Sequence, residues 1–568
     1  MFFLTLGQST PPRSRTLVKV NLPYGKSKGI TVTIPDDISV EEINPKEIPY
    51  SQNPVTLLQD AVEKPIGNVK PLPELVKDKK SVVVVVDDYT RDFPRDTVLI
   101  PFFDLLVEMG VDKKKVTILI GTATHKAPTP EQLEQILGKK IIKDYSVVVH
   151  DANAADLVDL GKTSRGTPIR VNKLYHDADC KILLTDVTFH YHAGFGGDRK
   201  SIMPAICGAD CINNNHGLLV DPNARTGNLD GNPVHLDMLE AAKRVGADFV
   251  VNVISEAGKG IIDIKAGELG AAFEQAVAIH KAHFNVRVEK QADMVIMSSG
   301  GYPKDINLYL ATKALTQTID GVKLGGSVIL LAECSEGIGN DNFEAWIDET
   351  SKHVAKTKDE AEKLAKSFDY LEKKIKSEFV MGGHKAYFIA REAKHARVSL
   401  ISGLDATLIS EKYFMEGVQV SSSKTIQKDV QAFIDKKIAE IQPKTIHVIP
   451  HGCELLVTHM NLIQTEKSVI SDAKRKVRIG PPFITKYEKS RIIGARALQL
   501  ALGAPPLIAP EHITPDKAEP IDIADIELQE KVLPIIIRRT LPSKQHEDYP
   551  VDVFPGDATA ITKDIFLH

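Results

Sequence analysis

The sequence has few cysteines, a single tryptophan and no long apolar run. Five cysteines in 568 residues are too few, and odd in number, for the disulfide framework of a secreted protein. No apolar stretch reaches the roughly 18 residues that cross a bilayer, and the apolar start 1–6 is too short for a signal peptide. We therefore expect a cytoplasmic protein with no membrane anchor.

A strong excess of charge of either sign is also missing. The chain has 71 Lys and Arg against 75 Asp and Glu, a formal net charge of −4. This balance disfavours a protein that coats nucleic acid and one that carries a long acidic tail. The length, at ~100–200 residues per domain, predicts about three or four domains.

Buried strands alternate with helices in two successive blocks. The β-branched run 81–86 is typical of a strand covered on both faces of a parallel sheet. An entry hairpin is expected over 17–36. The first block continues with a helix at 97–109, a strand at 115–120 and a helix at 129–137; the second has a helix at 266–288, a strand at 293–298, a helix at 305–317 and a strand at 326–332. The pattern predicts two doubly wound α/β domains with the site between them.

The chain changes character near residue 463. A polar and basic stretch that contains Lys474, Arg475, Lys476 and Arg478 runs into Gly480-Pro481-Pro482. We therefore expect a small C-terminal α+β domain after this linker. The predicted boundaries are 1–288 and 289–462 for the two α/β domains, 463–482 for the linker and 483–568 for the last domain.

Polar residues gather where the predicted strands end, which is where doubly wound sheets bind ligands. They are Asp87, Asp88, Thr90 and Arg91 after one strand, His125 after the next, and His190 and Lys200 after a third. A lone histidine there is usually structural, but two of them plus His216 favour a site. The glycine-rich segment 194–197 before Arg199 and Lys200 is either a phosphate cradle or a plain turn with exposed charges, and it is not a Walker A motif.

Five motifs follow one another between about residues 17 and 460. They are Asp88-x-Thr-Arg91, Gly-Thr-x-Thr-His125, His190-Tyr-x-Ala-Gly-Phe-x-Gly-x-Arg-Lys200-Ser, His216, and Gly300-Gly-Tyr-Pro-x-Asp-x-Asn-Leu-Tyr309-x-x-x-Lys313. In this order they resemble the nickel-pincer lactate racemase family. The resemblance implies a racemase or epimerase of a small 2-hydroxy acid. It also implies a nickel-pincer nucleotide, a pyridinium-3-thioamide-5-thiocarboxylate mononucleotide whose sulfur donors clamp nickel.

The resemblance also implies a role for each motif residue. Lys200 would hold the cofactor covalently, and His216 would ligate nickel in a near-planar geometry. His125 and His190 would alternate as general base and acid while hydride leaves the substrate Cα and returns. Arg91, Tyr309 and Lys313 would bind the substrate; Asp88, Thr90, Gly194, Gly197 and Arg199 would bind the nucleotide.

Some positions depart from the lactate-specific pattern. Leu310 stands where glutamine is expected, His192 replaces an aromatic residue, and Asp198 stands where glycine is usual. Segment 381–385 has no tryptophan, and the single one is Trp346. Lactate and other 2-hydroxy acids therefore both remain open as substrates.

The C-terminal segment has its own local signals. Thr485 and Glu488 predict a capping box before a helix at 486–502, and 533–539 predicts a strand with a basic end. Composition alone would favour a small docking domain with a basic face. The residues of 485–505, 534–542 and 547–549, however, closely resemble the archaeal subunit K, eukaryotic sixth subunit and ω type of DNA-directed RNA polymerase subunit. The resemblance implies a non-catalytic domain that binds the largest polymerase subunit through 483–555 and meets DNA only through the polymerase.

Three hypotheses follow. The first is an enzyme with a polymerase-binding tail. The second is an assembly protein, chiefly a polymerase subunit, whose long part is inactive or only binds nucleotide. A dehydrogenase of the NAD type is disfavoured because no Gly-x-Gly-x-x-Gly follows the first strands. Joint retention of Lys200, His216, His125 and His190 favours the first.

Overall fold

The protein divides into two compact units, Met1–His459 and Met460–His568. The expected linker 463–482 lies outside the residues that the structure describes. The computed structural model describes residues 17–91, 93–256, 258–420, 425–459, 484–502, 504, 506–508, 519–529, 533, 536–540 and 546–550.

The first sheet of the long unit is parallel except at one edge. Its order is β13 (Gly260–Gly267), β12 (Phe249–Glu256), β9 (Cys180–Asp186), β4 (Val82–Asp87), β5 (Val116–Gly121) and β6 (Ser146–Val149), with β13 antiparallel to β12. Alternate valines of β4 face opposite cores. Val82, Val84 and Val86 pack with α1 (Pro54–Glu63), α3 (Ile100–Glu108) and α4 (Pro130–Asp144), while Val83 and Val85 share a core with α7 (Pro233–Val245).

The second sheet is parallel throughout. Its order is β18 (Glu416–Gln419), β17 (Arg397–Ser402), β16 (Val322–Leu331), β15 (Ala292–Ser298), β19 (Thr445–Ile449) and β3 (Ser39–Glu42). One face packs against α14 (Ile426–Ile441). The other face and its surroundings hold α9 (Leu308–Thr318), α10 (Asp341–Val354), α11 (Glu360–Ser377) and α12 (His384–His395), and α13 (Ala406–Lys412) precedes β18.

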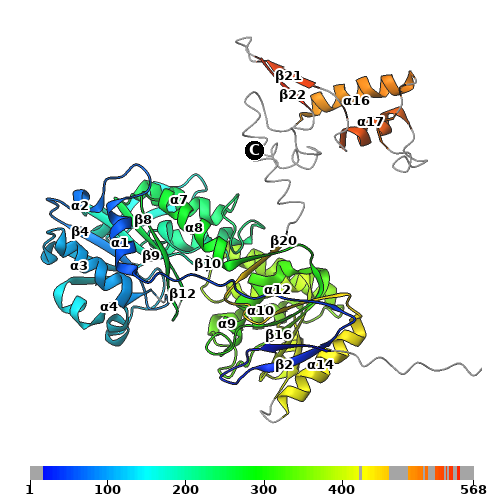
Figure 1. Ribbon diagram of the computed structural model, residues 1–568, viewed down its shortest axis with the longest axis horizontal. Helices are drawn as coiled ribbons and strands as arrows, with labels where there is room; N and C mark the ends of the chain where they lie inside the picture. Colours follow the sequence, from blue (N-terminus) through cyan, green and yellow to red (C-terminus); the bar gives the residue numbers. More distant parts are fainter. Residues whose placement is uncertain are drawn as a thin grey trace, which may run out of the picture. The chain divides into compact units, whose positions relative to one another are not determined.

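The N-terminal strands are built into the second lobe. The predicted hairpin is β1 (Leu17–Leu22) with β2 (Ile30–Pro35), and its apolar side joins the core beneath α14. Figure 1 shows these dark blue strands beside the yellow α14. The expectation of 1–288 as one lobe therefore does not describe this segment, because the hairpin buries its apolar side in the second core. We call residues 44–284 the first lobe, and 17–43 with 285–459 the second lobe.

Several short elements complete the long unit. The predicted helix 266–288 is shorter, because α8 (Ala271–Phe284) follows β13 and leads into β14 (Asn285–Val288), which pairs with β20 (Leu456–His459). The π-helical turn Arg95–Leu99 precedes α3, and the 3-10 turns are Lys113–Lys115, Asp198–Ser201, Leu218–Val220 and Ile319–Gly321. The others are α2 (Leu72–Leu75), β7 (Val158–Lys162), β8 (Pro168–Val171), α5 (Lys173–His176), β10 (Phe189–His190), β11 (Gly194–Phe195) and α6 (Ala209–Gly217).

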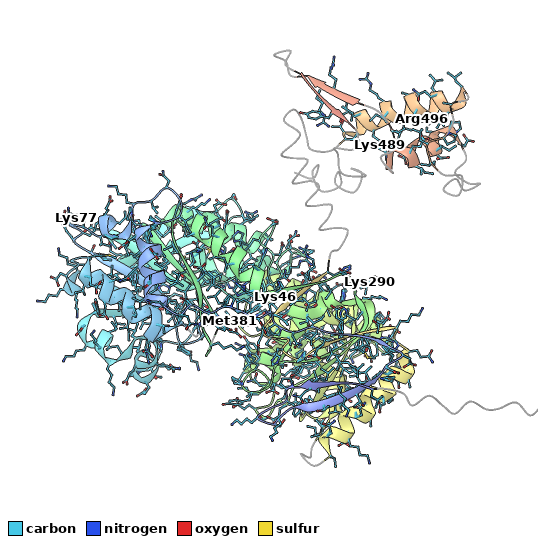
Figure 2. The ribbon with its side chains drawn as sticks, in the orientation of Figure 1. Lys46, Lys77, Lys290, Met381, Lys489 and Arg496 are labelled. Atoms are coloured by element: carbon cyan, nitrogen blue, oxygen red, sulfur yellow. The ribbon has the colours of Figure 1, made fainter. Side chains whose placement is uncertain are left out.

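The described tail contains α16 (Lys486–Ala501), α17 (Pro520–Gln529), β21 (Ile536–Thr540) and β22 (His546–Pro550). The predicted capping box is present, with Thr485 and Glu488 bonding each other's backbone N–H. Arg496 of α16, labelled in Figure 2, forms a buried ion pair with Glu527 of α17. The predicted fold class, two α/β lobes and a small α+β tail, is confirmed. No helix among the described residues is long and apolar enough to cross a membrane.

Candidate functional site

The strands β4, β5 and β9 end at one edge of the first sheet, and the polar residues that follow them line a common pocket. Parallel pairing brings these carboxyl ends together. Six of the predicted site residues lie here, on segments up to 112 positions apart in the chain (200 − 88). They are Asp88, Thr90, Arg91, His125, Gly197 and Lys200, and they share the pocket with Asp87, Gly121, Ala123, Asp186, Gly196, Pro204 and Ala205.

Asp88 orients His125. The buried carboxylate lies 2.6 Å from Nδ1 of His125 and accepts hydrogen bonds from the backbone N–H and the hydroxyl of Thr90 at 3.0 and 2.5 Å. Burial alone would raise the pKa of Asp88, but these hydrogen bonds outweigh it and hold the pKa below the usual value. Asp88 is therefore an ionised acceptor for Nδ1–H, which leaves Nε2 of His125 for proton transfer.

His190 and Lys200 are in direct contact. Nζ of Lys200 lies 3.0 Å from Nε2 of His190, while Nδ1 of His190 accepts the backbone N–H of Ala193 at 3.3 Å. Burial lowers the pKa of both groups well below their usual values. The charge of Lys200 lowers the pKa of His190 further, and the charges of Arg91 and Arg199 lower that of Lys200. The lowered pKa of Lys200 favours its uncharged amine, the form that can act as a nucleophile.

Arg199 points away from the pocket into the protein. Its five N–H groups donate to four backbone carbonyls, of Ala193, Phe195, Gly196 and Gly197, and to Nδ1 of His235. The guanidinium also lies 4.2 Å from the ring centre of Phe273. This side chain holds the shape of segment 193–197, and that shape sends Lys200 towards the pocket.

Backbone geometry explains two glycines of this segment. Gly194 has φ of +76°, and a Cβ there would lie 2.3 Å from the carbonyl oxygen of Asn228. Gly197 has φ of +89°, and a Cβ there would meet the carbonyl of Asp186 at 2.9 Å. Gly194 is packed against protein and does not line the pocket, whereas Gly197 does.

Four histidines extend the site towards the second lobe. His192 contacts the rings of His190 and His216, with ring centres 4.5 and 4.7 Å apart. His192 is buried with both ring nitrogens unpartnered, and Nδ1 of His216 is also buried without a partner. Nε2 of His384, from the second lobe, lies 2.8 Å from the hydroxyl of Tyr191.

The predicted substrate residues come from both lobes. Tyr309 and Lys313 lie one helical turn apart on α9, which Asn307 caps. The charge of Arg91, from the first lobe, lowers the pKa of both side chains, although burial has the larger effect on each, raising that of Tyr309 and lowering that of Lys313. The three are therefore close enough to act on one bound molecule.

The long unit of the chain is similar to known proteins. The family model "Lactate racemase N-terminal domain" matches residues 24–227, and "Lactate racemase C-terminal domain" matches 287–457. The lactate racemase of Thermoanaerobacterium thermosaccharolyticum is 34% identical over 347 residues, which are 59% of this chain and 79% of that protein. That of Lactiplantibacillus plantarum is 30% identical over 332 residues, 58% of this chain and 77% of that protein.

The chain belongs to the lactate racemase family. The solved lactate racemase apoprotein from T. thermosaccharolyticum has a TM-score of 0.66 and 28% identity, and the alignment covers 78% of this chain and all of that one. The suspected resemblance is confirmed, and the long part of the chain is a racemase-type isomerase.

The tail has relatives of its own. The family model "RNA polymerase Rpb6" matches 479–535. The DNA-directed RNA polymerase subunit Rpo6 of Aeropyrum pernix is 52% identical over 66 residues, which are 12% of this chain and 72% of that subunit. The chain therefore joins lactate racemase-like domains to an Rpb6-type domain.

Two departures from the lactate racemase pattern have a structural explanation. Asp198 has φ of +52°, a left-handed conformation that favours glycine and that Asp tolerates better than most residues. Its buried carboxylate accepts backbone N–H groups of Arg199 and Gly270. Segment 381–385 begins at Met381, labelled in Figure 2, and leads into α12 with His384 and Lys385 buried at the site.

An acidic pair at the site was given no role from the sequence. Asp87 and Asp186 end the neighbouring strands β4 and β9, and both line the pocket. Burial raises the pKa of Asp87 to about 8, with a further rise from Asp186, so Asp87 is mostly protonated at neutral pH. The signal was present, because each aspartate directly ends an apolar strand.

A larger cavity of about 650 Å³ lies elsewhere, at the opposite end of the second sheet. It is lined by residues such as Arg397, Phe414, Glu416 and Lys437, and by none of the predicted site residues. The candidate site is therefore identified by its chemistry, not by the size of its pocket.

Proposed function

We propose that residues 17–460 form a 2-hydroxy acid racemase or epimerase that works with a nickel-pincer nucleotide, and that 483–555 attach it to RNA polymerase through the largest subunit. The observation that carries the enzymatic part is the half-buried Lys200 in contact with His190, at the same pocket as the Asp88–His125 pair. Lactate racemases that this chain matches over most of their length support it.

The residues fit the proposed nucleotide. Lys200 has the amine form needed for a covalent link, and Gly196, Gly197 and Thr90 line the pocket where a phosphate would bind. His216 offers a neutral imidazole, as a nickel ligand requires, because burial lowers its pKa well below the usual value. Among the described residues, no group of three or more His, Cys, Asp or Glu side chains could hold a metal. A pincer ligand requires a single protein donor.

The histidines supply proton transfer. When bound, the cofactor provides a reversible acceptor for hydride from the substrate Cα. His125 takes the hydroxyl proton through Nε2, with Asp88 stabilising the imidazolium that forms. Nδ1 of His190 accepts the N–H of Ala193, so the neutral ring carries its proton on Nε2, the atom that faces Lys200. His190 is therefore the general acid while His125 is the base, and the two exchange roles for the opposite substrate enantiomer. Two bases, one for each enantiomer, make the reaction reversible between them.

The substrate carboxylate is held from both lobes. Arg91 offers a planar pair of donors suited to a carboxylate, and Lys313 adds a second cation. Tyr309, one turn from Lys313 on α9, adds a hydroxyl donor. Closure of the two lobes on the substrate would exclude water from the reacting atoms.

The tail works in transcription without catalysing a reaction. The Rpo6 relatives support association with RNA polymerase in the cytoplasm, with DNA contacted only through the polymerase. The second hypothesis, a polymerase subunit with an inactive racemase part, makes different predictions for the site. It gives no reason for Lys200 and His190 to be in contact beside an intact Asp88–His125 pair.

The decisive experiment is an intact mass and a peptide map of the chain isolated from cells that make the cofactor. We expect a cofactor-sized adduct at Lys200 in the full-length chain, and nickel that is lost in His216→Ala. Arg170→Ala, at a half-exposed ion pair 2.6 Å from Asp210, is the control and should keep its nickel. An unmodified Lys200 in nickel-free protein would refute the enzymatic proposal. If RNA polymerase purified from the native cell does not contain this chain, the tail assignment is refuted.

A further inference from the structure

The cations around the site outnumber the carboxylates that lie near them. Lys304 is paired with Glu454, and Asp186 lines the same pocket as Arg91. Asp87 adds little negative charge, since it is mostly protonated at neutral pH. Lys313 and Lys385 then remain, and no described carboxylate lies within ion-pair distance of either.

Lys385 is the more unusual of the two. It is 4% exposed, and its one hydrogen bond in the described structure is a long one, 3.4 Å to the hydroxyl of Thr312, the neighbour of Lys313. Its ammonium lies 5.1 Å from the ring centre of Tyr191 and 5.2 Å from that of Tyr309. Lys385 is therefore directly beside the predicted substrate residues of α9.

Two tyrosine faces do not fully replace the hydration of an ammonium group. A cation–π contact contributes about 0.5–2 kcal/mol, whereas removing a charge from water costs several kcal/mol. Burial, with a contribution from Lys313, lowers the pKa of Lys385 to about 8, so the amine still carries its charge at pH 7. A buried charge of this kind is stabilised by an anionic partner that arrives with a ligand.

We infer that the substrate is a 2-hydroxy acid with a second carboxylate, of the malate type, and that Lys385 binds that second group. This inference rests on the proposed function. Lys313 and Arg91 hold the carboxylate next to the reacting carbon, and Lys385 holds the distal one. Leu310, where lactate-specific relatives are expected to have glutamine, and the missing tryptophan in 381–385 agree with a site adapted to a different side chain.

The test compares malate with lactate on the full-length, cofactor-loaded chain, by chiral analysis of each pure enantiomer. We expect malate to be racemised with the higher kcat/KM. In Lys385→Met, kcat/KM for malate should fall about 10–100-fold, which corresponds to the loss of one charged hydrogen bond. The value for lactate should change little. Lys385→Arg should recover part of the malate activity.

Lys394→Met is the matched control. Lys394 lies on the same helix with its ammonium 3.9 Å from the ring centre of Phe368, but it is exposed. The variant Lys394→Met should leave the activities with malate and with lactate unchanged. Equal or better activity with lactate, or an equal loss of both activities in Lys385→Met, would overturn the inference. A loaded enzyme that racemises neither acid would also overturn the inference, whereas the adduct at Lys200 and the nickel content test the proposed function separately. Calorimetric titration of the unloaded chain with malate and with lactate separates binding from turnover.

Discussion

Replacing Arg199 by methionine should disorder the segment that carries Lys200. All five guanidinium N–H groups are used, and the side chain is fully buried. Methionine has a similar length but no donors, so four backbone carbonyls and His235 lose their partner. The neighbouring Asp198, also fully buried, loses the nearest positive charge.

The magnitude follows from these contacts. Leaving one buried hydrogen-bond acceptor without its donor costs about 1–3 kcal/mol. The carbonyls of Phe195 and Gly197, at 2.8 and 3.0 Å from the guanidinium, are two such acceptors, and the total depends on how far water can replace the lost donors. We take 3–5 kcal/mol as the change in the local opening free energy.

Hydrogen exchange measures this quantity directly. At 1.4 kcal/mol for each tenfold change, protection of the backbone amides in 193–201 should fall by about two to three and a half orders of magnitude. Amides of β17 in the second lobe serve as an internal reference and should change little. Arg170→Met, at a half-exposed ion pair, is the control substitution and should leave protection within about threefold.

A result near wild type would refute the reasoning. If Arg199→Met keeps protection of 193–201 within threefold of the unmodified chain, the carbonyls have other partners or the segment does not depend on them. Arg199→Lys separates charge from geometry. Lysine keeps the charge but has three donors in place of the fork, so intermediate protection is expected.

Three further predictions concern the site and the tail. Gly194→Ala should lower the thermal midpoint far more than Gly110→Ala in melting experiments, because both have positive φ but only Gly194 faces a carbonyl within 2.3 Å; equal shifts would contradict this. Asp88→Asn should lower kcat of the loaded enzyme by about 100-fold with little change in KM, since His125 loses its orienting acceptor. Because the folded pKa of Asp88 is lowered, the stability that this carboxylate contributes is present above about pH 3.9 and is lost as the pH falls through the folded pKa. Urea unfolding of the wild-type chain and the variant at several pH values checks this. Arg496→Met in the full chain should cost about 3–5 kcal/mol of local stability in α16, because the buried carboxylate of Glu527 would lose its cation. Hydrogen exchange of the α16 amides measures this cost. Lys489→Met, at the more exposed pair with Asp525, should cost much less.

Strands and site residues were predictable from the sequence for a common physical reason. A strand buried on both faces must be apolar throughout, so the run over Val82–Val86 is visible, and the first polar residues after it mark the ligand edge. Asp88, His125 and Lys200 were found by this rule together with the family motifs. Asp87 and Asp186 follow the same rule but were given no role, because their pairing depends on two strands lying side by side.

The N-terminal hairpin and the glycine-rich segment show what local patterns leave out. Alternation in 17–36 predicts a hairpin, but nothing in those residues says which core it joins, and it joins strands more than 250 positions later in the chain. The glycine-rich pattern before Arg199 and Lys200 is compatible with a phosphate site that has two cations. The pattern does not say which of the two side chains points towards the pocket. In the folded chain Arg199 is turned inward by four carbonyls, and Lys200 alone faces the pocket. Arg199 stabilises the segment, and Lys200 is available for reaction in the pocket. This difference depends on where the carbonyls of 193–197 converge in the folded chain.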